Sequence, residues 1–440
     1  MQSKNNSLSI IGAGLAGSEA CYQAARRGVD VTLYEMKPVK YSPAHKIEGF
    51  SELVCSNSLG TTAENHAAGI LKAEMAGADS LIIEAAFKTR VPAGGSLSVD
   101  RQLFSDYITE KLTSLDNVTI VRDEVTSLDD IDGMKIVATG PLTSDALSES
   151  IKQKIDAEYL YFYDAIAPII AAESIDEEKT YFASRYDKGD PDYLNCPFTE
   201  DEYKTFIAEL LKGDTVKLRE FEKEVNYDAC MPVETLASKG EDTLRFGAMK
   251  PVGLYDKKHD CMPYAVLQLR KEDINGDYYN MVGFQTKLKY QEQKRIFSMI
   301  PGLENADFVR CGSLHRNTFI NAPKLLDSYL RLKSDPTVMF AGQITGVEGY
   351  LESTAMGLIT GIAAKYIMSG EEMPLPKETT SMGALLNYLK SDAKHFQPSG
   401  VNFGIYPPLL KKYRKKERKE AYARRAHEDF ASFSAAIKIP

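Results

Sequence analysis

Three glycines near the start of the chain constrain its fold more than any other feature. Gly12, Gly14 and Gly17 form a Gly-x-Gly-x-x-Gly pattern between an apolar segment at residues 8–11 and a helix-like segment at residues 18–26. In a strand-turn-helix unit, the first glycine permits the tight turn and the second lets a pyrophosphate approach the backbone. The third allows the helix to pack closely on the strand. The pattern therefore predicts a dinucleotide site at the start of a parallel sheet.

The next segment supports this interpretation. Residues 29–34 predict a second strand that leads into Glu35, 18 residues after Gly17. A carboxylate at this point can accept hydrogen bonds from both ribose hydroxyls. Backbone N–H groups at the helix N-terminus bind phosphates, and we count Leu15 and Ala16 among the cofactor-binding residues. A tight turn without a ligand is the alternative, and this context disfavours it.

Glycines much later in the chain indicate which dinucleotide is bound. Residues 138–140 close a late strand on Gly140, and residues 340–349 contain Gly342, Gln343 and Gly346 before a long predicted helix at residues 349–368. A second backbone loop that returns to the flavin end is typical of FAD-binding folds, and NAD dehydrogenases lack it. We expect FAD as the resident cofactor and a nicotinamide donor as a visitor.

The length of the chain and a change in composition along it predict a discontinuous domain organisation. A chain of 440 residues is too long for one ordinary core. From about residue 173 to residue 260 the sequence becomes richer in charged residues and tyrosine, and turn-forming residues interrupt it irregularly. We expect an α/β protein: a Rossmann-type FAD-binding domain, residues 1–170 and 315–440, with an inserted α+β domain, residues 171–314. Predicted strands at residues 264–269 and 279–284 belong to the inserted domain.

Composition excludes several classes of protein. The chain has no uncharged apolar run of the roughly 20 residues that a membrane helix needs. Its first apolar segment runs into the glycine turn, so we expect no signal peptide and a cytoplasmic location. The formal net charge of −9 argues against a nucleic-acid-binding surface over the whole protein but permits a local basic patch. The six cysteines show no CxxC pair or zinc-like clustering, and we expect neither disulfides nor a metal.

Two cysteines have neighbours that favour chemistry over burial. Cys55 lies in the polar segment 52–59, shortly after the second strand, and Cys230 lies in segment 229–234, which contains a proline. An isolated cysteine is usually a small core residue. Polar or bent surroundings make these two candidates for function, whereas we interpret the remaining four cysteines as core: Cys21, Cys196, Cys261 and Cys311.

Several motifs in order now resemble a known family. The sequence is similar to the folate-dependent, FAD-containing tRNA uracil-5-methyltransferases from Ile10 to about Ala426. The motifs that carry the resemblance lie at residues 12–20, 33–36, 53–59, 91–95, 184–189, 250–254, 315–318 and 342–352. Several motifs in the same order, with both cysteines in place, are more specific than any one of them.

The resemblance implies a reaction and its participants. 5,10-Methylenetetrahydrofolate would supply the carbon, and FAD reduced by NADPH or NADH would supply the reducing equivalents. The substrate would be RNA, with the T-loop uridine (position 54) of tRNA as the target. Uracil C5 is a poor nucleophile until a group adds at C6, and a thiolate suits that reversible addition. By similarity Cys230 attacks C6, and Cys55 removes the C5 proton or shields Cys230.

Other residues leave alternatives open. Gly60, Ala248 and Cys311 stand where the family pattern has a basic residue, a proline and a tyrosine, so a 23S rRNA uridine remains an alternative substrate. Two further classes of protein are also alternatives. One is a different flavoenzyme, such as a related wobble-uridine-modifying flavoprotein or a small-molecule oxidoreductase. The other is a non-catalytic flavoprotein that binds RNA or a partner. Candidate cations near a thiol or phosphate, and a candidate proton carrier, are Lys250, Arg245, Arg316 and His315.

A basic stretch near the C-terminus is the clearest RNA-binding candidate. Residues 411–425 contain nine Lys or Arg against Glu417 and Glu420. Such a stretch can contact phosphates, or can be a solvated helix face. Tyr413 and Tyr422 are candidates to stack on bases or to pack within the protein. A target uridine in a folded loop must leave its stack to reach a cysteine.

Overall fold

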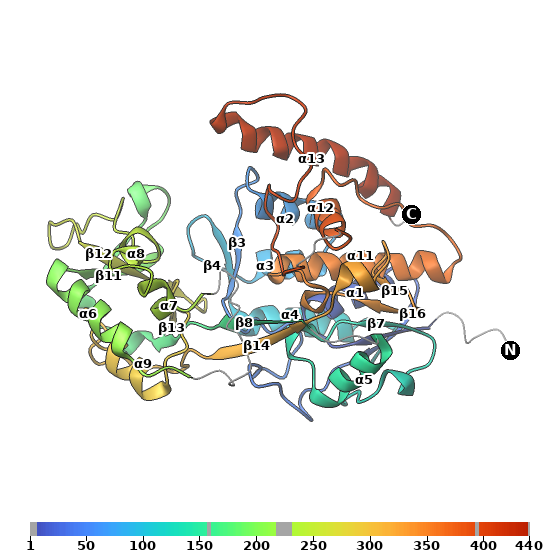
Figure 1. The fold of residues 1–440 in the computed structure, drawn as a ribbon, viewed down its shortest axis with the longest axis horizontal. Helices are drawn as coiled ribbons and strands as arrows, with labels where there is room; N and C mark the ends of the chain where they lie inside the picture. The colour runs from blue at the N-terminus through green and yellow to red at the C-terminus, as the bar shows by residue number, and fades with distance from the viewer. Residues whose placement is uncertain (1–6, 156–159, 217–230, 392–395, 439–440) are drawn as a thin grey trace.

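The computed structural model describes residues 7–155, 160–216, 231–391 and 396–438. The chain forms a large lobe, which contains both ends of the described chain, and a small lobe built from its middle (Figure 1). Each lobe has its own hydrophobic core. The large-lobe core takes residues from Leu8 to Ile155 and from Phe319 to Ile437, and the small-lobe core takes residues from Ile170 to Ala306. The domain boundaries at residues 170 and 315 remain a prediction.

A six-stranded sheet forms the centre of the large lobe, in the order β15-β16-β7-β1-β2-β6. Its strands are β15 (Arg331–Leu332), β16 (Asp335–Phe340), β7 (Met134–Val137), β1 (Ser7–Ile11), β2 (Asp30–Tyr34) and β6 (Val118–Val121). All neighbours pair in parallel except β15 and β16. The carboxyl ends of five strands therefore meet at one edge, where α/β folds bind their ligands.

The large lobe has nine helices in the described part of the chain. They are α1 (Leu15–Ala25), α2 (Ala67–Gly77), α3 (Leu81–Lys88), α4 (Arg101–Thr113), α5 (Asp145–Ile155), α10 (Ala322–Leu325), α11 (Tyr350–Met368), α12 (Ser381–Tyr388) and α13 (Lys415–Ile437). Helix α11 packs closely on α1. A Cβ at Gly357 would lie 2.1 Å from the Ala16 carbonyl oxygen, and one at Gly361 would lie 2.4 Å from that of Ala20.

The small lobe is built on an antiparallel sheet in the order β10-β11-β12-β13-β9. Its strands are β9 (Ile169–Ala171), β10 (Tyr181–Ala183), β11 (Tyr193–Phe198), β12 (Ala265–Lys271) and β13 (Tyr278–Met281), and its helices are α6 (Glu200–Lys212), α7 (Val233–Ala237), α8 (Thr243–Phe246) and α9 (Tyr290–Phe297). Phe206, Phe284 and Phe297 make ring contacts within its core. This lobe is thus an α+β unit with a core of its own.

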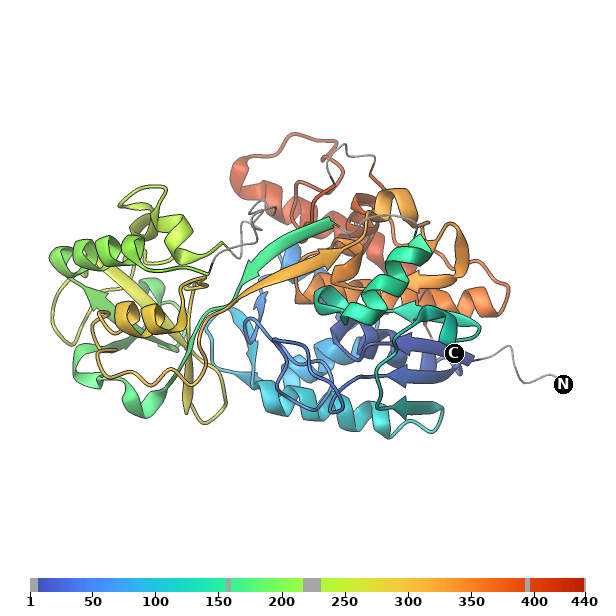
Figure 2. The same ribbon diagram turned by 60° about the horizontal axis from the view of Figure 1, so that its bottom comes forward.

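Two smaller strand groups lie where the lobes meet. Strands β8 (Leu160–Ala165) and β14 (Leu314–Phe319) pair antiparallel and form the two-stranded connection between the lobes (Figure 2). Strands β3 (Ser58–Thr61), β4 (Arg90–Val91) and β5 (Ser96–Val99) form a separate small sheet on the large lobe. Because β3 begins three residues after Cys55, this sheet positions the Cys55 segment beside the small lobe.

The observed elements agree with most of the sequence predictions. The predicted strands at residues 8–11 and 29–34 are β1 and β2, those at residues 264–269 and 279–284 are β12 and β13, and the predicted helix at residues 349–368 is α11. Helix α1 begins at Leu15 rather than at Ser18, because Gly14 is already its N-cap. Among the described residues, no helix is both long and apolar enough to cross a membrane.

Candidate active site and cofactor cleft

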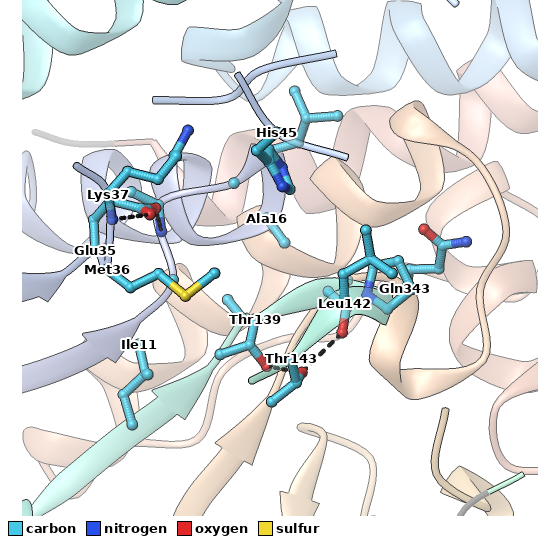
Figure 3. A pocket seen from close by; sticks show the side chains of 18 of the residues that line it. Ile11, Ala16, Glu35, Met36, Lys37, His45, Thr139, Leu142, Thr143 and Gln343 are labelled. Carbon is cyan, nitrogen blue, oxygen red and sulfur yellow. Dashed lines mark hydrogen bonds between the residues drawn. The ribbon is translucent and has the colours of Figure 1, made fainter. Parts of the chain in front are cut away.

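A cleft of about 1130 Å³, counting the part open to solvent, lies at the carboxyl edge of the parallel sheet. Its wall is formed by segments that follow the ends of β1, β2, β6, β7 and β16. In Figure 3, Glu35, Met36 and Lys37 lie on one side, and Thr139, Leu142 and Thr143 lie on another. The topology alone therefore brings segments far apart in the sequence into one site.

The three glycines of the first turn have different surroundings. Gly12 has a φ of +98°, and a Cβ there would lie 2.8 Å from the Ala138 carbonyl oxygen. A Cβ at Gly17 would lie 1.8 Å from the Gly12 carbonyl oxygen, so this glycine lets α1 pack against the turn. A Cβ at Gly14 would meet nothing within 4 Å and would occupy the cleft. Gly14 therefore keeps space open in front of the N-terminus of α1.

That N-terminus is suited to bind phosphate. Leu15 and Ala16 form the first turn of α1 and line the cleft. The first N–H groups of a helix have no acceptor within the helix, and the helix dipole favours an anion at this end. Ser18 N–H donates to the Gly14 carbonyl oxygen at 2.9 Å, which begins the regular hydrogen bonding. Backbone donors thus face the space that Gly14 keeps open.

Glu35 lines the cleft and is 6% exposed. Its Oε2 accepts a hydrogen bond from Ala13 N–H at 3.0 Å, and its Oε1 accepts one from Lys37 N–H at 3.0 Å. Each carboxylate oxygen keeps a second lone pair for a ribose hydroxyl. Glu35 therefore joins the glycine turn to the segment after β2, in addition to the ribose contact that the sequence predicts.

The opposite wall is formed by the two later glycine segments. Gly140 has a φ of +67° with nothing within 4 Å of a Cβ, and Gly342 has a φ of +81° and lies against Ala16. Thr139 and Thr143 share a hydrogen bond of 2.6 Å between their hydroxyl groups, and Gln343 Nε2 donates to Glu348 Oε2 at 2.6 Å. These contacts hold the second loop in place before a ligand binds.

Two predicted cofactor residues lie behind the wall. Gly17 packs on Gly12, and Gly346 adopts a φ of +93° in a turn where a Cβ would lie 2.5 Å from the Phe396 ring. Neither lines the cleft. The other eight predicted cofactor residues line it: Gly12, Gly14, Leu15, Ala16, Glu35, Gly140, Gly342 and Gln343. A helix N-terminus, an open glycine, a buried carboxylate and two backbone loops together fit a dinucleotide such as FAD.

Sequence reasoning missed several residues of the cleft, Lys37 among them. Lys37 Nζ donates to the backbone oxygens of Ile47 at 3.0 Å and Gly49 at 2.7 Å. Burial lowers the pKa of Lys37, although the nearby Glu35 and Glu52 oppose this change. A signal was present in the sequence, because Lys37 lies two residues after Glu35, just beyond the end of β2.

Cys55 lies at the rim of the cleft. Its backbone N–H donates to Tyr350 Oη at 2.7 Å, and the N–H of Ser56 donates to the same oxygen at 3.2 Å. Tyr350, the first residue of α11, lines the cleft, as does Val54. Burial raises the pKa of Tyr350, and the nearby Cys55 adds to this effect, so the phenol stays protonated at neutral pH. The thiol segment is thereby tied to the cofactor cleft.

The small lobe holds the same segment from its other side. Arg270 on β12 donates to Asn57 Oδ1 at 3.0 Å and to Ser56 Oγ at 2.7 Å, and Asn57 Nδ2 donates to the Lys271 carbonyl oxygen at 2.9 Å. Arg101, at the start of α4, donates to the carbonyl oxygens of Leu53 and Cys55. The Cys55 segment therefore lies between the two lobes.

Arg101 completes this link between the lobes. Its Nε lies 2.5 Å from Glu272 Oε2, and both side chains are almost fully buried. Asp100, next to it, accepts a hydrogen bond from Ile274 N–H at 3.2 Å. Breaking a buried pair by removing one partner is costly, so these contacts favour one arrangement of the lobes around Cys55.

Cys230 lies outside the described residues, but the segment that follows it is well anchored. Val233 N–H donates to the Gln285 carbonyl oxygen at 2.7 Å. Glu234 accepts hydrogen bonds from Thr286 Oγ1 at 3.0 Å and from Lys287 N–H at 2.6 Å. The position of Cys230 relative to Cys55 remains a prediction.

The remaining cysteines follow the sequence prediction only in part. Cys21 and Cys196 are fully buried, and burial raises the pKa of each thiol. The expectation of a core residue is wrong for Cys261, which is exposed in a turn where its backbone pairs with Asp256. It is also too strong for Cys311, which is half-buried.

The candidate cations have different positions. Arg245 has a structural role: its Nε donates to the Tyr264 carbonyl oxygen at 3.1 Å, and its guanidinium lies 4.1 Å from the Tyr264 ring centroid. Lys250 is exposed. The side chains of His315 and Arg316, on β14, lie outside the described residues.

Position 60 has an ammonium group close by, although its own residue is glycine. A Cβ at Gly60 would lie 3.9 Å from Lys72 Nζ, and that Nζ donates to the Leu59 carbonyl oxygen at 2.6 Å. Burial lowers the pKa of Lys72 to about 8, and Glu352 opposes this change. Helix α2 therefore supplies a cation beside the position where the family pattern has a basic residue.

Comparison with known proteins adds independent findings. Residues 7–372 match the family model described as glucose inhibited division protein A. A Geotalea daltonii protein named "Methylenetetrahydrofolate–tRNA-(uracil-5-)-methyltransferase TrmFO" is 55% identical over 436 residues, which is 99% of this chain and 99% of that protein. A Bacillus cytotoxicus protein of the same name is 53% identical over 97% of this chain and 98% of its own length.

The fold also has solved relatives. The structure of Aquifex aeolicus GidA in its form II crystal matches with a TM-score of 0.69 and 17% identity, over 98% of this chain and 73% of that chain. The form I crystal gives the same TM-score over 97% of this chain and 76% of that chain. At this identity the likeness supports the Rossmann-type α/β fold alone.

Proposed function

The chain belongs to the methylenetetrahydrofolate–tRNA-(uracil-5-)-methyltransferase family, and we propose that it methylates the T-loop uridine (position 54) of tRNA. It is an enzyme that transfers a carbon from 5,10-methylenetetrahydrofolate to uracil C5. FAD is the resident cofactor, and NADPH or NADH reduces it. The substrates of this reaction occur in the cytoplasm, and we therefore place the enzyme there.

One observation carries the proposal. The Cys55 segment is bound to Tyr350 on the rim of the dinucleotide cleft and to Arg270 on the small lobe. A thiol at that point lies beside the cleft and between the lobes, and a base taken out of its stack would have to reach this point to meet both the thiol and the flavin. A reaction that uses both a flavin and a pyrimidine needs one position that both can reach.

The protein would hold the cofactor through backbone groups and one carboxylate. The N-terminus of α1 would bind the pyrophosphate in the space beside Gly14, and Glu35 would accept hydrogen bonds from the ribose. The loops at Gly140 and Gly342, which line the same cleft, would lie at the flavin end. When bound and reduced, FAD supplies the two electrons that turn the transferred methylene carbon into a methyl group.

The two cysteines activate the base. The Cys230 thiolate adds to uracil C6, which makes C5 a nucleophile that bonds to the folate carbon. Cys55 would then accept the proton from C5 as the bond between the transferred carbon and the folate nitrogen breaks and tetrahydrofolate leaves. Once that carbon is reduced to a methyl group, the bond between Cys230 and C6 breaks and restores the ring. Tyr350 and Arg101 fix the backbone of Cys55 during these steps. The products are 5-methyluridine in the RNA, tetrahydrofolate and oxidised flavin.

The test is a reconstituted reaction. Purified protein is incubated with 5,10-methylenetetrahydrofolate, NADPH and either unmodified tRNA or a 23S rRNA transcript, and mass spectrometry of nuclease fragments locates 5-methyluridine. We expect it in the T-loop fragment of tRNA. Its appearance only in rRNA would move the target, and its absence from both RNAs would remove the proposal.

Cysteine variants test the assigned roles. Cys230→Ala and Cys55→Ala should abolish methylation while FAD content stays that of the wild type. Cys261→Ala is the matched control, because Cys261 is an exposed thiol with no contact to the cleft. Full activity of Cys230→Ala would favour a different class of flavoenzyme.

A further inference from the structure

The basic segment at residues 411–425 and helix α13 have a defined place in the structure. The basic end of α13 extends past α2 above the β3–β4 sheet, on the side of the large lobe that faces the small lobe (Figure 1). Lys419 Nζ lies 3.2 Å from Nε2 of His66, which is the N-cap of α2. The chain runs from Cys55 along strand β3, which ends at Thr61, to His66 beside the basic segment.

The rest of α13 is anchored, so the basic end has a fixed position. Ala426, Phe430 and Phe433 are buried on its inner face. Ser434 Oγ donates to the Gly77 carbonyl oxygen at 2.9 Å, and a Cβ at Gly77 would lie 3.1 Å from the Phe430 ring. Because its apolar face is used within the protein, the helix has no apolar face left for a membrane surface.

The positive charges of the segment divide into bound and free groups. Arg425 donates to the carbonyl oxygens of Pro407 at 2.7 Å and Pro408 at 3.0 Å, so it has a structural role. Four other cations are exposed and, within the described ranges, make no hydrogen bond or ion pair through their side chains: Lys411, Lys412, Arg418 and Arg424. Free cations without acceptors on the protein are available to an external polyanion.

The aromatic residues of the segment divide in the same way. Tyr422 stacks on Phe403 at a ring distance of 4.8 Å and an interplanar angle of 17°, so it packs within the protein. Tyr413 is half-exposed beside Lys412 and Arg414. An accessible aromatic ring among free cations suits the combined stacking and phosphate binding of RNA recognition.

We propose that the exposed cations of residues 411–424 form a docking surface for the phosphate backbone of the RNA substrate. This inference rests on the proposed function and adds the surface that binds RNA outside the cleft. The surface is local on a chain of formal net charge −9, so it directs a polyanion to one side of the protein. That side leads through β3 to Cys55, which orients the RNA toward the thiol.

The test removes the four free cations together in the full-length holoenzyme. We expect the variant Lys411→Ala, Lys412→Ala, Arg418→Ala, Arg424→Ala to raise the KM for tRNA at least about tenfold at moderate salt, with kcat nearly unchanged. The slope of log KM against log salt should decrease by about 3, since each lost phosphate contact removes somewhat less than one unit. FAD content and the rate of flavin reduction by NADPH should match the wild type.

A second variant removes four charges elsewhere. Lys179, Lys204, Lys294 and Lys324 are exposed and lie outside the basic segment, and their joint replacement by Ala should leave the KM and its salt slope unchanged. Equal effects of both variants, or no effect of either on KM, would overturn the proposal. Loss of binding to an acidic protein by the first variant, with its KM for tRNA unchanged, would also overturn the proposal. If wild-type protein methylates no RNA, the proposed function fails instead.

Discussion

At the scale of single residues, the role of each glycine depends on the atoms that a Cβ at its position would contact. Gly12, Gly14 and Gly17 belong to one motif, yet a Cβ would strike backbone at the first and third and enter open space at the second. The sequence predicted these three roles because the spacing of the motif fixes them. It could not predict the role of Gly346, since Phe396, which crowds it, lies 50 residues further along the chain.

Two alanine substitutions in this motif should have opposite effects. Gly17→Ala places its methyl group against the Gly12 carbonyl oxygen and should cost about 1–3 kcal/mol of stability, which thermal unfolding measures. Gly14→Ala should leave the unfolding temperature of the FAD-free protein unchanged. It should nevertheless lower FAD content, because its methyl group fills the phosphate space. Equal destabilisation by both substitutions would contradict these assignments.

At the scale of elements, parallel strands and close helix packing create the cleft. The sequence predicted β1, β2 and α11 well, because their apolar segments are clear. It did not predict the close packing of α11 on α1 at Gly357 and Gly361, since a glycine within a helix does not indicate which element packs against it. That packing is what brings Tyr350 to the cleft.

A buried carboxylate between helices should make stability depend on pH. Glu74 on α2 is fully buried and accepts hydrogen bonds from Ser381 N–H at 2.7 Å and Met382 N–H at 2.9 Å, at the start of α12. Burial raises its pKa from 4.5 to about 8, although these hydrogen bonds oppose the change. The folded protein therefore binds this proton more tightly than the unfolded chain does.

The stabilising effect of protonated Glu74 is complete below pH 4.5 and is lost as pH rises toward 8. Between these limits, the wild type should lose about 1.4 kcal/mol per pH unit relative to Glu74→Gln, which cannot ionise. Unfolding temperatures of both proteins, measured from pH 5 to pH 8, provide the comparison. A difference that stays constant with pH would contradict the account.

At the scale of the whole molecule, the two lobes hold one thiol segment between them. The sequence predicted an inserted region and two functional cysteines, and it missed Arg270, Asn57 and Arg101 as the residues that join the lobes. These contacts link positions about 170 to 215 residues apart, and no local pattern in one sequence encodes them.

Arg270 should therefore act as a positioning residue. Arg270→Gln removes the guanidinium that binds Ser56 and Asn57, and we expect kcat for methylation to fall about 10- to 100-fold with FAD content and the KM for tRNA little changed. Arg270→Lys should recover only part of this loss, because Lys cannot make both contacts with the same geometry.

Arg295→Gln is the matched control for this prediction. Arg295 lies on the same lobe in exposed ion pairs with Glu209 and Glu292, and exposed pairs contribute little to stability. Its kcat should equal that of the wild type. A kcat of Arg270→Gln equal to that of this control would show that the small lobe does not position Cys55.

The source of the methyl carbon tests the central claim most directly. The holoenzyme is supplied with unmodified tRNA, NADPH, carbon-13-labelled 5,10-methylenetetrahydrofolate and unlabelled S-adenosylmethionine, and the tRNA nucleosides are analysed by mass spectrometry. We predict that 5-methyluridine carries the label and forms only while FAD is bound. Unlabelled 5-methyluridine, or labelled product from protein stripped of FAD, would contradict this account.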